Sequence, residues 1–322
     1  MLEKHLLKER VPAPATELNE QGLEKLSEEE RKAWHLLVPY VRKLAIKLSS
    51  FEGYVDPNIM KADTEFVEQM EQKFLRDDPR IAASQRRGEI LEALLAEGIK
   101  HAKWLGPDTE PIIASRYDDI KNGVDFVLEI LENQKFGYLA LNVDVTSSIV
   151  QIGNNLEEVK KKIISGDLTE IKYFQSKRSG ITGKKDTIPK VVIGIDSNAL
   201  KELSLLRVEL NTYRAALKKP ENSSPTVQES LIKKAKEAGL KLSSHRIQVL
   251  ILKEIEIQIE KYIEFANKNN YTKVASIYQS ALNTIREIKS RPEAPKLSPN
   301  EEDQNSNDKV FQALQSALKD FN

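Results

Sequence analysis

A predicted hairpin with one aspartate on each arm constrains the fold of this chain more than any other stretch. Residues 123–146 form two apolar, strand-like segments, which carry Asp125 and Asp144. A symmetric turn centred on Gln134 and Lys135 would place the two aspartates directly opposite each other on one face of the sheet. Like charges in that position are destabilising unless something lies between them, and a divalent cation such as Mg²⁺ meets that requirement. A register displaced by one residue would instead send one aspartate to the opposite face.

The composition allows a large folded core and limits the classes of binding site. The 322 residues suffice for one large domain or two smaller ones, and 40% of them are hydrophobic. With 49 basic and 49 acidic residues the chain has no net charge, which argues against a general nucleic-acid coat but permits a local basic patch. The absence of cysteine excludes disulfides, thiolate zinc sites and cysteine nucleophiles.

The sequence predicts no association with a membrane. The first ten residues lack the apolar core of a signal peptide. No apolar run approaches the ~18 residues needed to span a bilayer. We therefore expect a soluble, cytoplasmic protein.

The first part of the chain is predicted to be helical. Ser27 and Glu30 have the spacing of a capping box at a helix start. An acid followed by proline, at 56–57 and again at 78–79, marks two further starts. We expect residues 1–78 to form a helical N-terminal extension.

The central part of the chain, residues 79–218, alternates helices and strands. A helix at its start is followed by three strands, a helix, and further strands before a last helix. The predicted strands lie near 111–117, 123–130, 136–146, 171–174 and 190–195, and the later helices near 154–164 and 196–217. This order predicts an α/β fold with a mixed central sheet of about four to five strands flanked by helices.

The C-terminal part of the chain is predicted to be mostly helical. Within residues 219–290, the segment 245–289 fits a helical hairpin, which would pack on the core or form a seam with a partner or a second copy. Residues 291–322 read as a disordered linker followed by a short amphipathic helix.

Three acidic residues resemble the motif of a known family. Glu89 on a helix, Asp125 on a strand and Asp144 on the next strand are similar to the PD-(D/E)XK nuclease superfamily, over about residues 80–195. That family has a core of helix, three strands, helix and strand. The resemblance implies that Glu89, Asp125 and Asp144 bind Mg²⁺ or Mn²⁺, that both aspartates serve catalysis, and that the substrate is DNA or RNA.

One position departs from the family motif. A lysine is expected two residues after Asp144, where this chain has Thr146. Lys172 on a following strand is the candidate catalytic substitute, with Lys121 behind it. If neither points into the site, the protein is an inactive, nuclease-fold module that acts through protein interactions. The alternative for the acids themselves is that they are surface carboxylates at strand and turn ends.

A basic stretch could bind the substrate backbone. Residues 160–190 contain nine Lys or Arg and three Asp or Glu, a local excess of six positive charges. A polar loop within it carries the candidate nucleic-acid-binding residues, which are Lys177, Arg178, Lys184 and Lys185. The alternative is a solvated helix face and a soluble loop.

Overall fold

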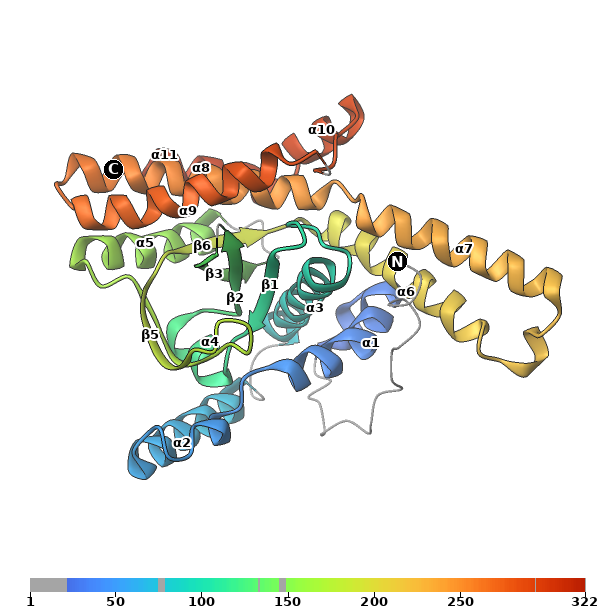
Figure 1. The fold of residues 1–322 in the computed structure, drawn as a ribbon, viewed down its shortest axis with the longest axis horizontal. Coiled ribbons are helices and arrows are strands. Elements are labelled where there is room, and N and C mark those ends of the chain that lie inside the picture. The colour runs from blue at the N-terminus through green and yellow to red at the C-terminus, as the bar shows by residue number, and fades with distance from the viewer. Residues whose placement is uncertain (1–21, 75–78, 133, 145–148, 293, 322) are drawn as a thin grey trace.

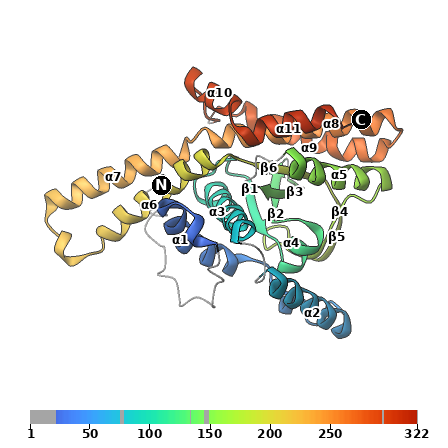
Figure 2. The ribbon, with the colours of Figure 1, turned by 180° about the vertical axis from the view of Figure 1, so that it is seen from behind.

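The protein is built around one mixed β-sheet surrounded by helices (Figure 1). A computed structural model describes residues 22–74, 79–132, 134–144, 149–292 and 294–321. The predicted α/β class with a central mixed sheet is confirmed. Two helical parts extend away from the body in opposite directions, α2 (Pro57–Phe74) on one side and the pair of α6 (Ser197–Ala216) and α7 (Pro225–Ser243) on the other (Figures 1 and 2).

The central sheet has four strands in the order β1-β2-β3-β6. Neighbours β1 and β2 are antiparallel, as are β2 and β3, whereas β3 and β6 are parallel. The strands are β1 (Thr109–Ile113), β2 (Phe126–Glu132), β3 (Lys135–Asp144) and β6 (Lys190–Gly194). The parallel pair is joined by a crossover that contains α5 (Ile149–Ser165), as parallel strands require.

A second, two-stranded sheet lies within the same crossover. It consists of β4 (Thr169–Gln175) and β5 (Thr182–Ile188), which are antiparallel. The strand expected near 171–174 is therefore present, but it does not join the central sheet. Residues 182–186, expected to belong to a polar loop, form part of β5. The sequence did not indicate this strand because its residues are mostly polar and its alternate side chains are exposed.

The turn between β2 and β3 falls one residue earlier than predicted. Lys135 lies opposite Glu132, so only two residues connect the strands. Gln134 adopts a positive φ of 63°, which this tight turn requires. A glutamine in this conformation gives no recognisable turn signal in the sequence.

The early turn changes the partner of Asp125. Leu141 lies opposite Phe126, so Asp125 is level with Asn142 and not with Asp144. The predicted direct pairing of the two aspartates is therefore wrong. A shift of two residues displaces Asp144 by ~7 Å along β3.

The two faces of the sheet pack against different elements. One face joins the main core, which also includes side chains from most of the helices. Its side chains are Phe126, Leu128, Ile130, Leu139, Leu141, Val191 and Ile193. The other face forms a smaller core beneath the β4–β5 sheet, with Val127 and Ala140 against Ile171, Phe174 and Ile188.

The N-terminal helices begin where the sequence predicted. Helix α1 (Glu28–Leu44) has the capping box, in which Ser27 Oγ accepts from the Glu30 backbone N–H at 3.2 Å and Glu30 Oε2 from the Ser27 N–H at 2.7 Å. Helices α2 (Pro57–Phe74) and α3 (Pro79–His101) each begin at the predicted proline. Helix α3 packs on β1 and β3 and carries Glu89 and Glu92 of the candidate site.

Helices α6 (Ser197–Ala216) and α7 (Pro225–Ser243) form a long projecting hairpin. Asp196 caps α6, since its Oδ1 accepts from the N–H groups of Asn198 and Ala199, each at 2.9 Å. Only two side chains of α7 are fully buried, Ala238 and Leu242. Figure 2 shows this pair of helices extending well beyond the sheet.

The C-terminal helices cover one edge of the central sheet. They are α8 (Ile247–Lys268), α9 (Thr272–Ser290), α10 (Pro299–Ser306) and α11 (Lys309–Lys319). The hairpin expected over 245–289 is present as α8 and α9, which pack on each other and on β6 and β3. Part of the expected disordered linker is instead α10, which begins with a capping box formed by Ser298 and Glu301. The sequence did not indicate this helix because its residues are almost entirely polar.

Candidate functional site

A short helix and a tight turn bring Asp125 to the start of β2. Helix α4 (Arg116–Asn122) is capped by Ser115 and ends at Gly123, whose φ of 57° is the left-handed conformation that favours glycine. The backbone of Asp125 then bridges two strands: its N–H donates to the Leu141 carbonyl and its carbonyl accepts from the Ala114 N–H, both at 3.0 Å. These bonds fix the position of Asp125 relative to the sheet.

The four carboxylates of Glu89, Glu92, Asp119 and Asp125 are close enough for their charges to influence one another. Glu89 and Glu92 come from α3, and Asp119 comes from α4. Burial, together with the charges of Asp125, Asp119 and Glu89, raises the pKa of Glu92 well above its ordinary value. Burial also raises the pKa of Asp119, although Arg116 opposes that effect. We call Glu92, Asp119 and Asp125 the carboxylate cluster.

Glu89 lies at the border of this cluster and is held by other groups. Its Oε1 accepts from Arg42 and from Arg86, each at 2.5 Å, and its Oε2 accepts from the Trp34 indole N–H at 2.7 Å. Burial would raise the pKa of Glu89, yet the two arginines hold it below its ordinary value. The helix glutamate with the more strongly perturbed carboxyl is thus Glu92, one turn further along α3.

Arg116 faces the carboxylate cluster from the first turn of α4. Its Nη1 donates to Asp119 Oδ2, and its Nε donates to Glu71 Oε1 of α2 at 3.1 Å. Burial alone would lower the pKa of Arg116, but Asp119 and Glu71 hold it above its ordinary value. Arg116 therefore supplies positive charge to a group of carboxylates that otherwise repel one another.

Asp118, next to Asp119 on α4, has a different environment. It is fully buried, and its two oxygens accept from the backbone N–H groups of Lys172 at 2.8 Å and Tyr173 at 3.0 Å. They also accept from Ser115 Oγ at 2.7 Å and Asn122 Nδ2 at 2.8 Å. Asp118 is thus a structural junction between α4 and β4.

The predicted catalytic lysine lies among other partners. The Lys172 ammonium pairs with Asp63 of α2 and lies 4.9 Å from the centre of the Tyr117 ring. Asp63 also accepts from the Tyr173 hydroxyl at 2.6 Å. None of these partners belongs to the carboxylate cluster.

A different lysine lies near Asp125. Lys190, at the start of β6, is only 8% exposed, and its ammonium donates to the Asn122 carbonyl at 2.9 Å. Burial lowers the pKa of Lys190, while the charges of Glu158 and Asp125 oppose that effect. In the sequence this lysine was one of nine in a basic stretch, and only its position at the head of a buried strand could have singled it out.

Two residues of the predicted motif are not fully described. The backbone of Asp144 pairs in register with Gly194, but its side chain lies outside the described part of the chain, and so does the whole of Thr146. Within the described residues, no group of three acidic, histidine or cysteine side chains is arranged to hold a metal ion. The donor set of the cluster, carboxylate oxygens alone, nevertheless fits the ligand preference of Mg²⁺ and Mn²⁺.

The four predicted nucleic-acid-binding residues are mostly engaged within the protein. Lys184 pairs with Glu170 at 2.8 Å and Asp186 at 3.1 Å. The ammonium of Lys185 lies 3.8 Å from the centre of the Tyr138 ring. Arg178 donates to the Asp108 carbonyl at 2.7 Å, and Lys177 is exposed in the turn between β4 and β5.

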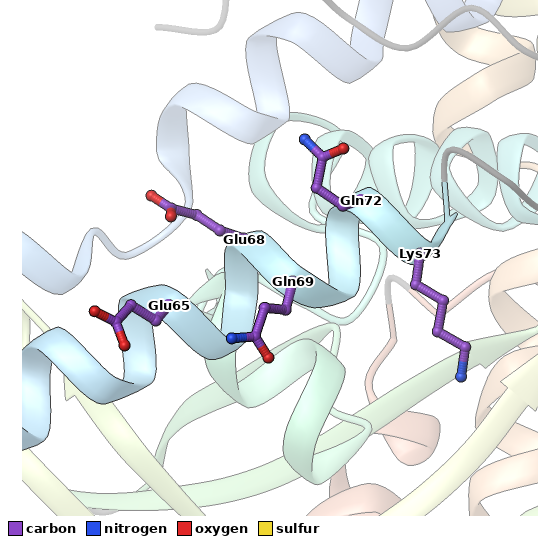
Figure 3. A pocket seen from close by; sticks show the side chains of 5 residues that line it. All are labelled: Glu65, Glu68, Gln69, Gln72 and Lys73. Carbon is purple, nitrogen blue, oxygen red and sulfur yellow. The ribbon is translucent and has the colours of Figure 1, made fainter.

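A hollow of about 540 Å³ on α2 lies outside the carboxylate cluster. Figure 3 shows the five side chains that line it, which are Glu65, Glu68, Gln69, Gln72 and Lys73. All five project from α2, are polar and are exposed. The hollow brings no nucleophile or aromatic surface together, so we do not assign it a function.

Comparison with known proteins identifies no relative. No protein-family model, curated protein or solved structure matches this chain. No helix within the described ranges is long and apolar enough to cross a bilayer.

Proposed function

We propose that this protein is a divalent-metal-dependent nuclease, or a nucleic-acid-processing module derived from one. The observation that carries the proposal is that the charge of Asp125, at the start of β2, acts on the carboxyl group of Glu92 on α3. A helix glutamate beside a strand aspartate is the pair that the resemblance to the PD-(D/E)XK superfamily implies. Here the glutamate is one helical turn beyond Glu89.

The order of the elements supports the proposal. Helix α3, strands β1, β2 and β3, helix α5 and strand β6 follow one another as helix, three strands, helix and strand. Helix α4 and the β4–β5 sheet are additions to that order. Since Asp125 and Asp144 lie on neighbouring strands, β3 would bring a further carboxylate to the same end of the sheet.

The acidic residues and Lys190 would have different roles in the reaction. Glu92 and Asp125, with Asp144, would hold the metal ion, which when bound would polarise a phosphoryl oxygen and lower the pKa of a water molecule. Lys190 carries a positive charge near Asp125 and would stabilise the negative charge that develops on the phosphate. It would thus supply what Thr146 cannot.

Cleavage assays with Mg²⁺ or Mn²⁺ on DNA and on RNA test this function. We expect metal-dependent cleavage by the wild type that falls at least ~100-fold in Asp125→Asn, Glu92→Gln and Lys190→Met. Lys172→Met is the matched control and should keep its activity. Absence of metal-dependent cleavage, or full activity in Asp125→Asn, would contradict the proposal. Loss of cleavage in Lys172→Met but not in Lys190→Met would show that Lys172 is the catalytic lysine.

A second candidate function is that of an inactive nuclease-fold module that binds a protein partner. The α6–α7 hairpin favours it, because Val227, Ile232 and Leu240 on α7 are large apolar side chains that are 39%, 41% and 68% exposed. We expect Leu240→Glu with Ile232→Glu to abolish recovery of a specific partner in this case. Metal-dependent cleavage without any recovered partner would exclude this candidate.

A further inference from the structure

Two adjacent lysines on β5 occupy different environments. The alternation of the strand leaves Lys184 exposed and turns Lys185 towards the central sheet. Lys184 pairs with Glu170 and Asp186, and its hydrogen bonds to them raise its pKa. Lys185 forms no ion pair with a described residue, and burial lowers its pKa against the opposing charge of Glu129.

The amine of Lys185 lies against an aromatic surface. Its Nζ is 3.8 Å from the centre of the Tyr138 ring and 5.7 Å from the centre of the Phe174 ring. A lysine in such surroundings, without a carboxylate partner, has a larger fraction of neutral amine near neutral pH. Because the neutral amine is the nucleophilic form, Lys185 has the environment of a reactive lysine, which Lys184 lacks.

A pocket of about 270 Å³ adjoins Lys185, and both Lys185 and Tyr138 line it. Its apolar lining comes partly from β2, β3 and α9, with Ile130, Leu139, Ile277, Ala281 and Ile285. The volume is slightly below the ~300–1,000 Å³ of most small-molecule sites. The pocket therefore suits a small ligand with an apolar part, held beside the amine.

Three buried oxygens beside this pocket also point to a ligand. Glu129 Oε1, the Tyr138 hydroxyl and Ser179 Oγ have no hydrogen-bond partner in good geometry among the described residues. Glu129 is 1% exposed and lies opposite Tyr138, so their side chains share the face of the sheet that β4 and β5 cover. Buried polar atoms without partners are costly, and a bound polar group would satisfy them.

We propose that Lys185 is a nucleophilic lysine that forms an imine with a small apolar aldehyde bound in this pocket. The neutral amine adds to the carbonyl carbon, so that a C–N bond forms and one proton passes from nitrogen to the carbonyl oxygen. The C–O bond then breaks, and the hydroxyl leaves as water with the second proton of the nitrogen. The Tyr138 hydroxyl, on the ring that Nζ contacts, supplies a hydrogen-bond donor to that oxygen. This reactivity does not depend on the proposed metal-dependent function.

Reductive trapping followed by peptide mass spectrometry tests this site. The full chain is incubated with benzaldehyde and sodium cyanoborohydride, which reduces any imine to a stable secondary amine. We expect modification of Lys185 to be at least about tenfold faster than that of Lys184 near pH 7, because one unit of pKa difference changes the fraction of neutral amine about tenfold. The rate at Lys185 should also level off at a lower pH. Equal rates at the two lysines would overturn the proposal.

Two variants test whether the pocket and the hydroxyl take part. Ala281→Phe fills the pocket from α9 and should abolish the fast reaction of Lys185 with benzaldehyde, whereas formaldehyde, the smallest aldehyde, should still react. The matched control Ala281→Ser should keep both reactions. Tyr138→Phe keeps the ring and should slow the reaction at least about tenfold without changing its pH dependence. Thermal unfolding confirms that each variant is folded. A folded Ala281→Phe that reacts with benzaldehyde as fast as the wild type would overturn the proposal.

Discussion

Two adjacent aspartates on α4 occupy opposite kinds of environment. Asp118 is buried among donors that saturate both of its oxygens, and these donors join α4 to β4. Asp119 instead faces other carboxylates, with Arg116 as its positive partner. A saturated carboxylate stabilises the fold, whereas a crowded one costs stability and is available to a ligand.

The edge of β6 also differs from the carboxylate cluster, because its polar neighbours are hydrogen-bonded to the backbone. Gln258 of α8 donates to the Val192 carbonyl at 2.6 Å and accepts from its N–H at 2.9 Å, so it replaces a missing strand neighbour. Glu254, one turn earlier, accepts from the Gly194 N–H at 3.1 Å. These polar side chains satisfy the backbone and thereby protect an edge strand from pairing with other chains.

The largest effect on stability is expected for Asp118→Ala. The change leaves the N–H groups of Lys172 and Tyr173 buried without their acceptor, and we expect a loss of roughly 3 kcal/mol in the free energy of unfolding. Denaturant unfolding measures it, with the exposed Asp167→Ala as control. A loss below about 1 kcal/mol would mean that Asp118 is not the junction described here.

A smaller loss is expected for Gln258→Ala. Two hydrogen-bonding groups of Val192 lose their partner at the sheet edge, and we expect a loss of about 2 kcal/mol. Chemical unfolding of this variant should be compared with that of Gln279→Ala on the exposed face of α9. Equal stability of the two variants would show that the edge is satisfied in another way.

In the carboxylate cluster, by contrast, removal of a carboxylate should increase the free energy of unfolding. Because the pKa of Glu92 is raised in the folded protein, the wild type loses stability as the pH rises above about 4.5, the ordinary value. We expect Glu92→Gln to be about 1 kcal/mol more stable than the wild type near pH 7, while it loses metal-dependent cleavage. Unfolding from pH 4 to 8 checks the sign, and a destabilised variant would place Glu92 with the structural carboxylates.

Glu254→Gln should give the smallest change in the free energy of unfolding. It tests whether Glu254 belongs with the hydrogen-bonded carboxylates or with the crowded ones. Burial and the charge of Asp308 raise the pKa of Glu254 well above its ordinary value, and its Oε1 has no hydrogen-bond partner among the described residues. We expect a gain of about 0.5 kcal/mol near pH 7 that disappears below about pH 4.5, since the new amide N–H also lacks a partner. Cleavage should stay unchanged; reduced cleavage would connect this position to the site.

Local signals in the sequence predicted much of the fold. Capping residues and prolines marked the starts of α1, α2 and α3, and the apolar pattern indicated the strands of the central sheet. The hairpin register was mispredicted because Gln134 takes a left-handed conformation without a glycine. The α10 helix was missed because its eight residues are almost entirely polar.

The site was predicted only in part, because its members meet through tertiary packing. Asp125 was identified from its place in the hairpin. Glu92 lies three residues from the predicted Glu89, and only the partners of each show which one faces Asp125. Asp119 lies on the short helix α4, and no motif in the sequence marks it as a neighbour of Asp125. Lys190 is distant in sequence from Asp125, so no spacing pattern could link them.

Anomalous diffraction from crystals soaked in Mn²⁺ would show whether the carboxylate cluster binds a metal ion. We expect one strong peak bonded to the carboxylates of Asp125 and Glu92. That peak should be absent from crystals of Asp125→Asn. A peak only at other acids, such as Glu65 and Glu68 on α2, or no peak in the wild type, would contradict the assignment of the carboxylate cluster as a metal site.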